Sequence, residues 1–334
     1  MDFIPQIHQS IVRQKLVAKS CRLVVAVSGG MDSMALLYAL YSLKHELGVE
    51  LIVAHYDHKL RRSSGLDRRF VQEISCFLGL RCVVGINLTK PPKTGSIEEY
   101  ARKKRYAFLI KTARDSKADF VALAHHEDDL AETVLLRVLR GTGLRGLRSM
   151  APKSLMEGVT LIRPFLDISR QDIERFVKGR KIPFVMDSTN FDTSFDRNKL
   201  RLKVIPFIEK EFFRSCQSAL AGLARSSIVD YSFLESEAEK AFLRVASERK
   251  KSVSINLKDF FSLHQAIQRM VLRRAFEKVR GNLRALGLKN MAEVEDFLAQ
   301  PSSTGRLELP QGLVVIKKGR GVVVRVNKSF KLQA

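Results

Sequence analysis

Short, largely apolar runs alternate with amphipathic stretches in the first half of the chain. The apolar runs predict buried strands at 24–27, 50–55, 82–88, 120–124 and 159–162. Apolar positions spaced three and four residues apart predict helices at 1–20, 34–40, 64–80, 96–116, 128–140 and 169–179. Strands that alternate with helices favour an α/β fold with a doubly wound, mostly parallel sheet that helices cover on both faces.

The pattern changes near residue 200. Helices are predicted at 200–250 and 258–300, and short strands follow at 307–316 and 321–326. A chain of 334 residues exceeds the size of ~250–300 residues at which a single hydrophobic core stops growing. We therefore expect an α/β domain at 1–212 and a mainly helical domain at 213–334 that ends in short strands.

A glycine-containing loop, Ser28-Gly29-Gly30-Met31-Asp32-Ser33, joins the first predicted strand to the next helix. Glycines permit a tight turn, and Asp or Ser near a helix start satisfies free backbone N–H groups. These N–H groups and the helix dipole form a site for phosphate, although a strand–helix turn without a ligand is the alternative. No Gly-Lys-Ser/Thr follows at the spacing of a Walker A motif, which disfavours ordinary P-loop chemistry.

The loop resembles the Ser-Gly-Gly-x-Asp-Ser signature of the PP-loop ATP pyrophosphatases. The resemblance implies that the protein binds ATP, cleaves it between the α and β phosphates, and adenylates its substrate. Ligands of parallel sheets bind at the carboxyl ends of the strands. We therefore expect the segments after the strands at 50–55 and 120–124 to lie in the same crevice as the loop.

The segment after the strand at 120–124 is His125-His126-Glu127-Asp128-Asp129-Leu130-Ala131-Glu132-Thr133. The helix dipole stabilises each acidic residue in a first turn by ~0.3–1 kcal/mol, so capping of the helix is one interpretation. The acids exceed what capping needs, and we expect Asp128, Asp129 and Glu132 to hold Mg²⁺ on the ATP phosphates. A histidine–carboxylate zinc site is the alternative, which the lack of nearby cysteines disfavours.

Other polar groups follow the same strands. The segment from His55 to Arg61 is either a site for a metal, or for a base and phosphate, or a solvated loop. Arginine is suited to gripping phosphates with two hydrogen bonds. The candidate cations near the expected crevice, some of which belong to solvated helix faces, are Arg102, Lys103, Lys104, Arg105, Arg137, Arg140, Arg145, Arg148, Arg197, Lys199, Arg201 and Lys203.

The charge of the chain indicates the class of partner. Lysine and arginine number 58 against 35 aspartates and glutamates, which gives a net charge of +23. Such an excess favours a nucleic acid or an anionic membrane, and a basic bias of the whole genome is the alternative. No apolar run approaches the ~18–20 residues that span a bilayer, and no signal peptide is evident. We expect a cytoplasmic protein that binds nucleic acid and no membrane, with its four scattered cysteines reduced.

The ordered series of these segments resembles the tRNA(Ile)-lysidine synthetase family of PP-loop enzymes. Each motif alone is shared with other PP-loop enzymes, whereas the series is more specific. The segments that carry the resemblance are 28–33, 55–61, 101–106, 125–133, 140–143, 163–166, 187–190 and 197–198.

This resemblance implies an ATP-dependent ligation of L-lysine to C2 of the wobble cytidine in a tRNA(Ile) with a CAU anticodon, through an adenylated cytidine. The loop residues Ser28, Gly29, Gly30, Met31, Asp32 and Ser33 would bind ATP, with Asp32 also near the metal. Asp129 would handle lysine or the metal, while Arg105 and Arg197 would serve catalysis and phosphate binding. His126 and Asp128 are further candidates, and the second domain would bind the tRNA.

Other functions fit part of the sequence. A PP-loop tRNA thiolase would also be basic, but no cysteine adjoins a motif here. A small-molecule amide ligase of the same superfamily has no use for the charge. A non-catalytic RNA-binding protein on the same fold has no use for Asp32, Asp128 and Asp129. The sequence leaves the oligomeric state open, with a homodimer as one alternative.

Overall fold

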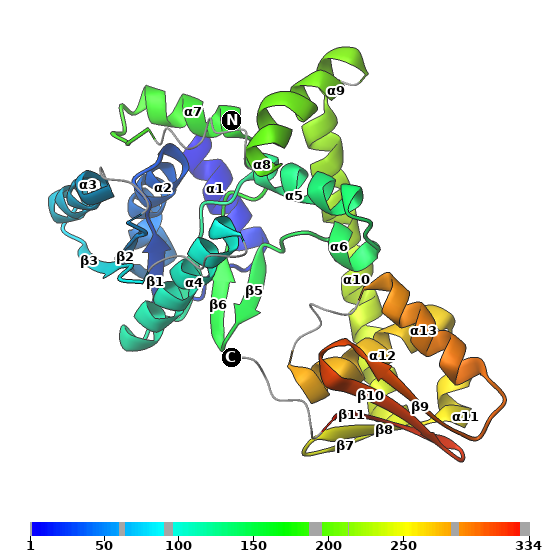
Figure 1. Cartoon of the computed structure of the whole chain (residues 1–334). Helices are drawn as coiled ribbons and strands as arrows, with labels where there is room; N and C mark the ends of the chain where they lie inside the picture. The colour runs from blue at the N-terminus through cyan, green and yellow to red at the C-terminus, as the bar shows by residue number, and fades with distance from the viewer. Residues whose placement is uncertain are drawn as a thin grey trace. The chain divides into compact units, whose positions relative to one another are not determined.

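The computed structural model describes residues 2–59, 64–89, 96–186, 196–212, 214–281 and 287–327, without the side chain of residue 288. The chain divides into two compact units (Figure 1). The first unit comprises Met1–Leu139 and Ser149–Ala224, and the second comprises Arg140–Arg148 and Arg225–Ala334. The boundary expected at residue 212 precedes this division, which falls inside the long helix α10 (Cys216–Val245).

The first unit is built on a six-stranded sheet with the order β3-β2-β1-β4-β6-β5. Neighbouring strands are parallel except for β5 and β6, which are antiparallel. The mostly parallel α/β fold predicted from the sequence is therefore confirmed. The strands are β1 (Cys21–Ala26), β2 (Val49–Asp57), β3 (Arg81–Ile86), β4 (Phe120–Ala122), β5 (Lys153–Met156) and β6 (Val159–Ile162).

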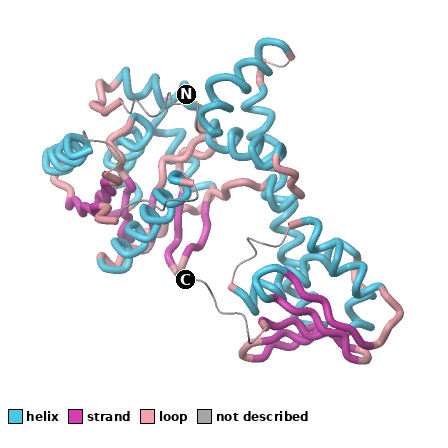
Figure 2. The backbone as a smooth tube through the Cα atoms, in the orientation of Figure 1, coloured by secondary structure: helices cyan, strands magenta, loops and turns pink. Residues whose placement is uncertain are grey.

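Helices cover both faces of this sheet (Figures 1 and 2). Successive strand residues point to opposite faces, so Val24 and Val25 of β1 enter two different apolar clusters. One cluster contains residues of α1 (Phe3–Arg13), α2 (Met31–Leu47), α3 (Ser64–Phe77) and α7 (Arg170–Gly179), and the other contains residues of α4 (Ile97–Asp115). The unit also holds α5 (Glu127–Leu139), α8 (Asp196–Lys199), the π-helical turn η2 (Leu200–Val204) and α9 (Ile205–Glu211).

Local signals explain where several of these helices begin and why one strand escapes prediction. The hydroxyls of Ser96 and Ser169 accept hydrogen bonds from N–H groups in the first turns of α4 and α7, so both serines are N-caps. Strand β5 is not predicted, because it is mostly exposed and carries little apolar signal. It joins β6 through Glu157 and Gly158, whose φ angles of 49° and 82° suit a two-residue hairpin turn.

The second unit contains a five-stranded antiparallel sheet with the order β7-β8-β11-β10-β9. Phe276, Val294 and Val315 are fully buried in its core. The sheet is larger than predicted, because β7 and β8 fall where the sequence pattern favours helix or loop. Its strands are β7 (Ala246–Arg249), β8 (Ser252–Asn256), β9 (Thr304–Leu309), β10 (Leu313–Lys318) and β11 (Gly321–Val326). Its other elements are α6 (Leu144–Leu147), most of α10, α11 (Leu257–Phe261), α12 (Gln265–Arg280), α13 (Leu288–Ala299) and η3 (Pro310–Gly312).

Within the described residues, no helix of either unit is both long and apolar enough to cross a bilayer.

Candidate active site

The loop between β1 and α2 has the geometry of an anion site. Gly30 is the N-cap of α2, so Met31, Asp32 and Ser33 form its first turn, and Met31 packs against the core. A helix leaves the N–H groups of its first turn without carbonyl partners, and these groups suit a phosphate. Gly29 has a φ of +92°, in the left-handed region where glycine is favoured.

Hydrogen bonds fix the shape of this loop. The hydroxyl of Ser33 donates to the carbonyl of Gly30 (2.8 Å) and accepts from the N–H of Ser28 (3.1 Å). The N–H of Val185 donates to the carbonyl of Gly29 (2.9 Å). This last contact joins segments far apart in the chain, and no sequence pattern indicates it.

His55 supports the loop from the neighbouring strand. Its Nδ1 lies 2.9 Å from the carbonyl oxygen of Val27, and the residue is buried. Burial lowers the pKa of His55, so the neutral ring donates its Nδ1–H to that carbonyl. His55 therefore holds the main chain at the start of the loop. His58 follows in the same segment, and burial, with Arg105 next in effect, lowers its pKa to about 4.

Three carboxylates converge on His126, which lies between β4 and α5. Nε2 of His126 is 3.7 Å from Oδ2 of Asp32 and 3.5 Å from Oδ2 of Asp129, and its Nδ1 is 3.7 Å from Oδ1 of Asp128. Burial disfavours the imidazolium, but the charges of these carboxylates outweigh it and raise the pKa of His126 to about 10. The structure thus brings the acid of the loop together with the acids of α5.

Arg197 of α8 completes the cluster. Its Nη2 donates to Oδ1 of Asp129 (2.7 Å), and its Nε donates to Oε2 of Glu132 (2.5 Å). Burial opposes the charge of Asp129, yet His126 and Arg197 together hold the pKa of Asp129 below its usual range. Burial dominates at Glu132, whose side chain is 1% exposed, and raises its pKa despite Arg197. Glu132 therefore anchors Arg197 beside Asp129.

Arg105 of α4 differs from Arg197 because no carboxylate pairs with it among the described residues. Its buried Nε lacks a hydrogen-bond partner in the part of the chain that the structure describes. Burial lowers the pKa of Arg105, and the guanidinium groups of Arg102 and Arg197 add to this effect. A buried cation with a free donor is suited to an anionic ligand. Arg105 stays a candidate for phosphate binding.

Arg163 is a buried residue whose role the sequence analysis leaves undefined. Its Nη1 donates to the carbonyl of Ala151 (2.7 Å) and to the hydroxyl of Ser154 (3.0 Å). These bonds fix β5 and the preceding turn against the end of β6. A charged residue between the apolar runs 159–162 and 164–166 was the available signal.

The acids were tested as ligands for Mg²⁺. Oδ1 of Asp32 is buried and has no hydrogen-bond partner among the described residues, which suits a cation. Asp128 accepts the N–H of Arg170 (3.0 Å), and Asp129 is paired with Arg197. No group of three or more His, Cys, Asp or Glu side chains in the described ranges could hold a metal ion. The residues fit a Mg²⁺ bound chiefly to phosphates with one or two protein carboxylates.

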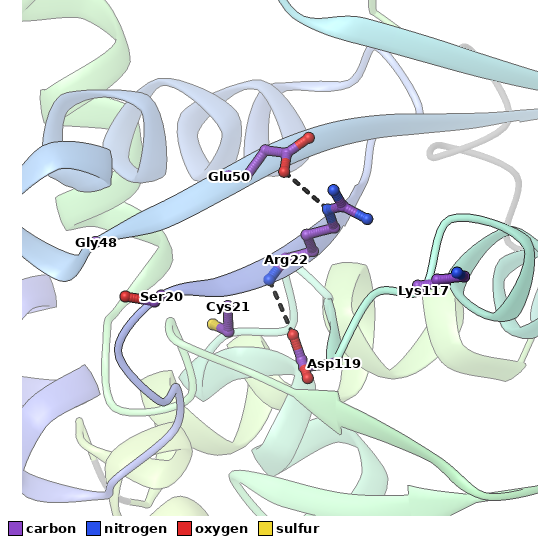
Figure 3. A pocket seen from close by; sticks show the side chains of 7 residues that line it. All are labelled: Ser20, Cys21, Arg22, Gly48, Glu50, Lys117 and Asp119. Atoms are coloured by element: carbon purple, nitrogen blue, oxygen red, sulfur yellow. Dashed lines mark hydrogen bonds and ion pairs between the residues drawn. The ribbon is translucent and has the colours of Figure 1, made fainter.

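A pocket of about 440 Å³ in the first unit lies at the amino ends of β1 and β2, whereas the loop follows the carboxyl end of β1 (Figure 3). Nε of Arg22 donates to Glu50 (2.8 Å) there, and its backbone N–H donates to Asp119 (2.9 Å). These groups satisfy one another, and the pocket contains none of the expected site residues.

The cysteines are distributed over different elements. All four are free, and they lie in β1, α3, β3 and α10. Of the segments that carry the family resemblance, 60–61 and 187–190 lie outside the described residues.

Among solved structures, the chain resembles the U34-tRNA thiolase NcsA from Methanococcus maripaludis, determined with its [4Fe-4S] cluster. The TM-score is 0.57 at 15% sequence identity, and the match covers 67% of this chain and 78% of that chain. A likeness at this identity shows the fold alone.

Sequence comparisons identify the family. The model of the PP-loop domain matches residues 3–208, and that of the TilS substrate binding domain matches residues 256–321. A tRNA(Ile)-lysidine synthase from Caldanaerobacter subterraneus is 31% identical over 332 residues, which cover 98% of this chain and 70% of that protein. One from Clostridioides difficile is 30% identical over 324 residues, with coverages of 96% and 70%. The chain belongs to the tRNA(Ile)-lysidine synthase family.

Proposed function

We propose that the protein ligates L-lysine to C2 of the wobble cytidine in a tRNA(Ile) with a CAU anticodon, at the expense of ATP. The observation that carries this proposal is the convergence of Asp32 and Asp129 on His126, beside a phosphate loop. The family membership supports tRNA as the substrate. The net charge of +23 supports a polyanionic partner.

In the first step, the C2 carbonyl oxygen of the cytidine forms a bond to the α-phosphorus of ATP, and pyrophosphate leaves. The N–H groups of the loop from Ser28 to Ser33 stabilise the charge that grows on pyrophosphate. Arg105 offers its buried Nε to a phosphate oxygen. Mg²⁺, with Asp32 as its first ligand and Asp128 and Asp129 beside it, would neutralise phosphate charge when bound.

In the second step, the lysine ammonium gives a proton to the carboxylate of Asp129, the resulting ε-amine forms a bond to C2, and the C2–oxygen bond breaks to release AMP. Asp129 would hold the lysine ammonium before this step, in competition with His126 and Arg197, whose cationic groups already lie beside its carboxylate. Arg197 orients Asp129 and contacts the phosphate of the leaving AMP. Positioning of this kind converts a bimolecular reaction into an effectively unimolecular one.

The cellular location and the oligomeric state of the protein are also of interest. We infer a cytoplasmic location, because ATP, lysine and uncharged tRNA occur together there. A homodimer stays a prediction, which sedimentation of the purified protein tests directly.

The experiment is an incubation with ATP, labelled lysine and a tRNA(Ile) transcript that carries the CAU anticodon. We expect ATP-dependent label in the RNA, with one AMP and one pyrophosphate released per lysine. The control transcript has uridine in place of the wobble cytidine and should stay unlabelled. Asp129→Asn should lower turnover by about 10²-fold or more. Label that is independent of ATP, or equal in both transcripts, would overturn the proposal.

A further inference from the structure

A cavity of about 450 Å³ in the second unit is lined by residues of α6, α10 and α12 and by Arg148, which follows α6. Figure 1 labels these three helices. Its volume falls within the ~300–1,000 Å³ typical of ligand pockets. It includes Arg145, which the sequence analysis notes as a candidate cation and the proposed reaction does not use. The charged and aromatic residues that line it are Arg145, Arg148, Arg273, Arg274, Glu235, Glu239, Glu277 and Tyr231.

The acids of this cavity are already paired. Glu235 accepts a hydrogen bond from Arg148 (2.9 Å). Glu239 and Glu277 lie 3.0 and 3.6 Å from nitrogens of Arg274. The cavity therefore contains no free carboxylate for its other two arginines.

Arg145 and Arg273 form neither a hydrogen bond nor an ion pair with any residue that the structure describes. Burial lowers the pKa of Arg273, and the charge of Arg145 lowers it further. A guanidinium keeps its proton in proteins, so the positive charges of Arg145 and Arg273 repel each other in this cavity. Such an arrangement is costly unless an anion enters the cavity.

Arg148 gives the cavity a fixed wall. Its guanidinium carbon lies 4.6 Å from the centre of the Tyr231 ring, and its Nη1 is bound to Glu235. Gly146 makes the turn that carries Arg145 and Arg148, since a Cβ there would lie 1.7 Å from Oγ1 of Thr142. The guanidinium of Arg148 is therefore preorganised rather than freely mobile.

We propose that Arg145 and Arg273 bind a phosphodiester group of the tRNA in this cavity, with Arg148 as a planar support for the adjoining ribose or base. Arginine binds phosphate through paired hydrogen bonds, and guanidinium planes stack on unpaired bases. The inference rests on the proposed tRNA substrate. The segment that contains Arg145 follows α5, the helix that contains Asp129, directly in the sequence.

The experiment measures tRNA binding by the full chain between about 50 and 200 mM salt. Arg145→Gln with Arg273→Gln should raise the Kd about tenfold and reduce the slope of log Kd against log salt by about 1. The KM for ATP should not change. The matched control, Arg249→Gln with Arg325→Gln, removes the same charge from exposed positions of β7 and β11 and should change the Kd less than about twofold.

A second pair of variants separates charge from geometry. Arg145→Lys with Arg273→Lys keeps both charges and loses the paired hydrogen bonds, so we expect the salt slope of the wild type and an intermediate Kd. Melting temperatures of all variants report whether each one folds. A lysine variant as weak as the glutamine variant also supports the arginine-specific contact.

Several outcomes would overturn the inference. If the wild type forms lysidine and the Arg145→Gln/Arg273→Gln protein binds tRNA equally well, this site is wrong and the proposed function stands. Equal losses in the cavity and control variants would indicate diffuse attraction. A free phosphate has the same chemistry, so inorganic phosphate that raises the melting temperature only of the wild type, with tRNA binding unaffected, would assign the cavity to a free anion. A wild type that neither binds tRNA nor forms lysidine would overturn both proposals.

Discussion

Replacing Arg197 with methionine removes the cation that Asp129 and Glu132 share. Glu132 would keep only the guanidinium of Arg201, whose Nε lies 4.0 Å from its Oε1. Breaking a buried ion pair by removing one partner costs about 3–5 kcal/mol, because the remaining charge stays buried. For a unit of this size, that loss lowers the melting temperature by about 6–20 °C.

A second substitution, at Glu132, should restore part of the lost stability. In the double variant Glu132→Leu/Arg197→Met, no charge is left in the buried position of Glu132, which is 1% exposed. Apolar residues of similar volume often replace a buried pair at little cost, so the double variant should recover about half of the lost stability. It should recover no lysine-ligating activity, because Arg197 contacts the reacting groups in our proposal. The double variant should therefore recover stability without recovering activity.

The pH dependence has a defined sign. Burial already raises the pKa of Glu132, and loss of Arg197 raises it further above the unfolded value. The folded Arg197→Met protein then binds more protons than its unfolded state. Its deficit should be smallest at acid pH, where Glu132 is neutral, and should grow as the pH rises.

Calorimetric melting of both variants and the wild type from about pH 5 to pH 8 tests this chain of argument, since carboxylate linkage is expressed over that range. The two units can melt separately, so the transition that shifts with Arg197 is the one to compare. An Arg197→Met protein as stable as the wild type, or a double variant no more stable than the single one, would refute the buried-pair account.

Two further predictions concern the loop and its neighbours. Gly29→Ala places a side chain at a φ of +92°, which should cost about 1–3 kcal/mol and raise the KM for ATP. Gly179→Ala, at the end of α7 with open space around it, should leave the KM unchanged and should not lower the stability. An equal KM in both variants would contradict this. Burial, with Arg105 second, lowers the pKa of His58 to about 4, so stability should be lost as the pH falls from 6.5 towards 4, and less steeply in His58→Gln. Identical melting curves against pH would remove His58 as the cause.

The fold of the first unit is largely predictable because its strands are buried on both faces. Strands such as β1 and β2 appear as near-continuous apolar runs, and Ser96 and Ser169 mark the starts of two helices. Edge strands carry weaker signals. Three of the four residues of β7 are exposed, so its sequence does not alternate and resembles the end of α10.

The candidate site is predictable in its membership and not in its connections. The rule that parallel strands bring their carboxyl ends together places the loop and the acids of α5 in one region. The bond from Val185 to Gly29 and the bond from Arg197 to Glu132 join segments that no local pattern relates. Such pairings are set by tertiary packing.

The acidic residues after β4 bind different groups of the protein, and this limits which of them are available to a metal ion or a substrate. Asp128 accepts a helix N–H from Arg170, as a capping role requires, and Glu132 is committed to Arg197. Asp129 shares Arg197 and His126, so a substrate ammonium must compete with cations already present. Oδ1 of Asp32 has no partner among the described residues and lies in the first turn of α2, which begins at the phosphate loop. We therefore propose that a metal–phosphate complex would have its strongest protein ligand at Asp32, with the acids of α5 serving mainly to position the cations around it.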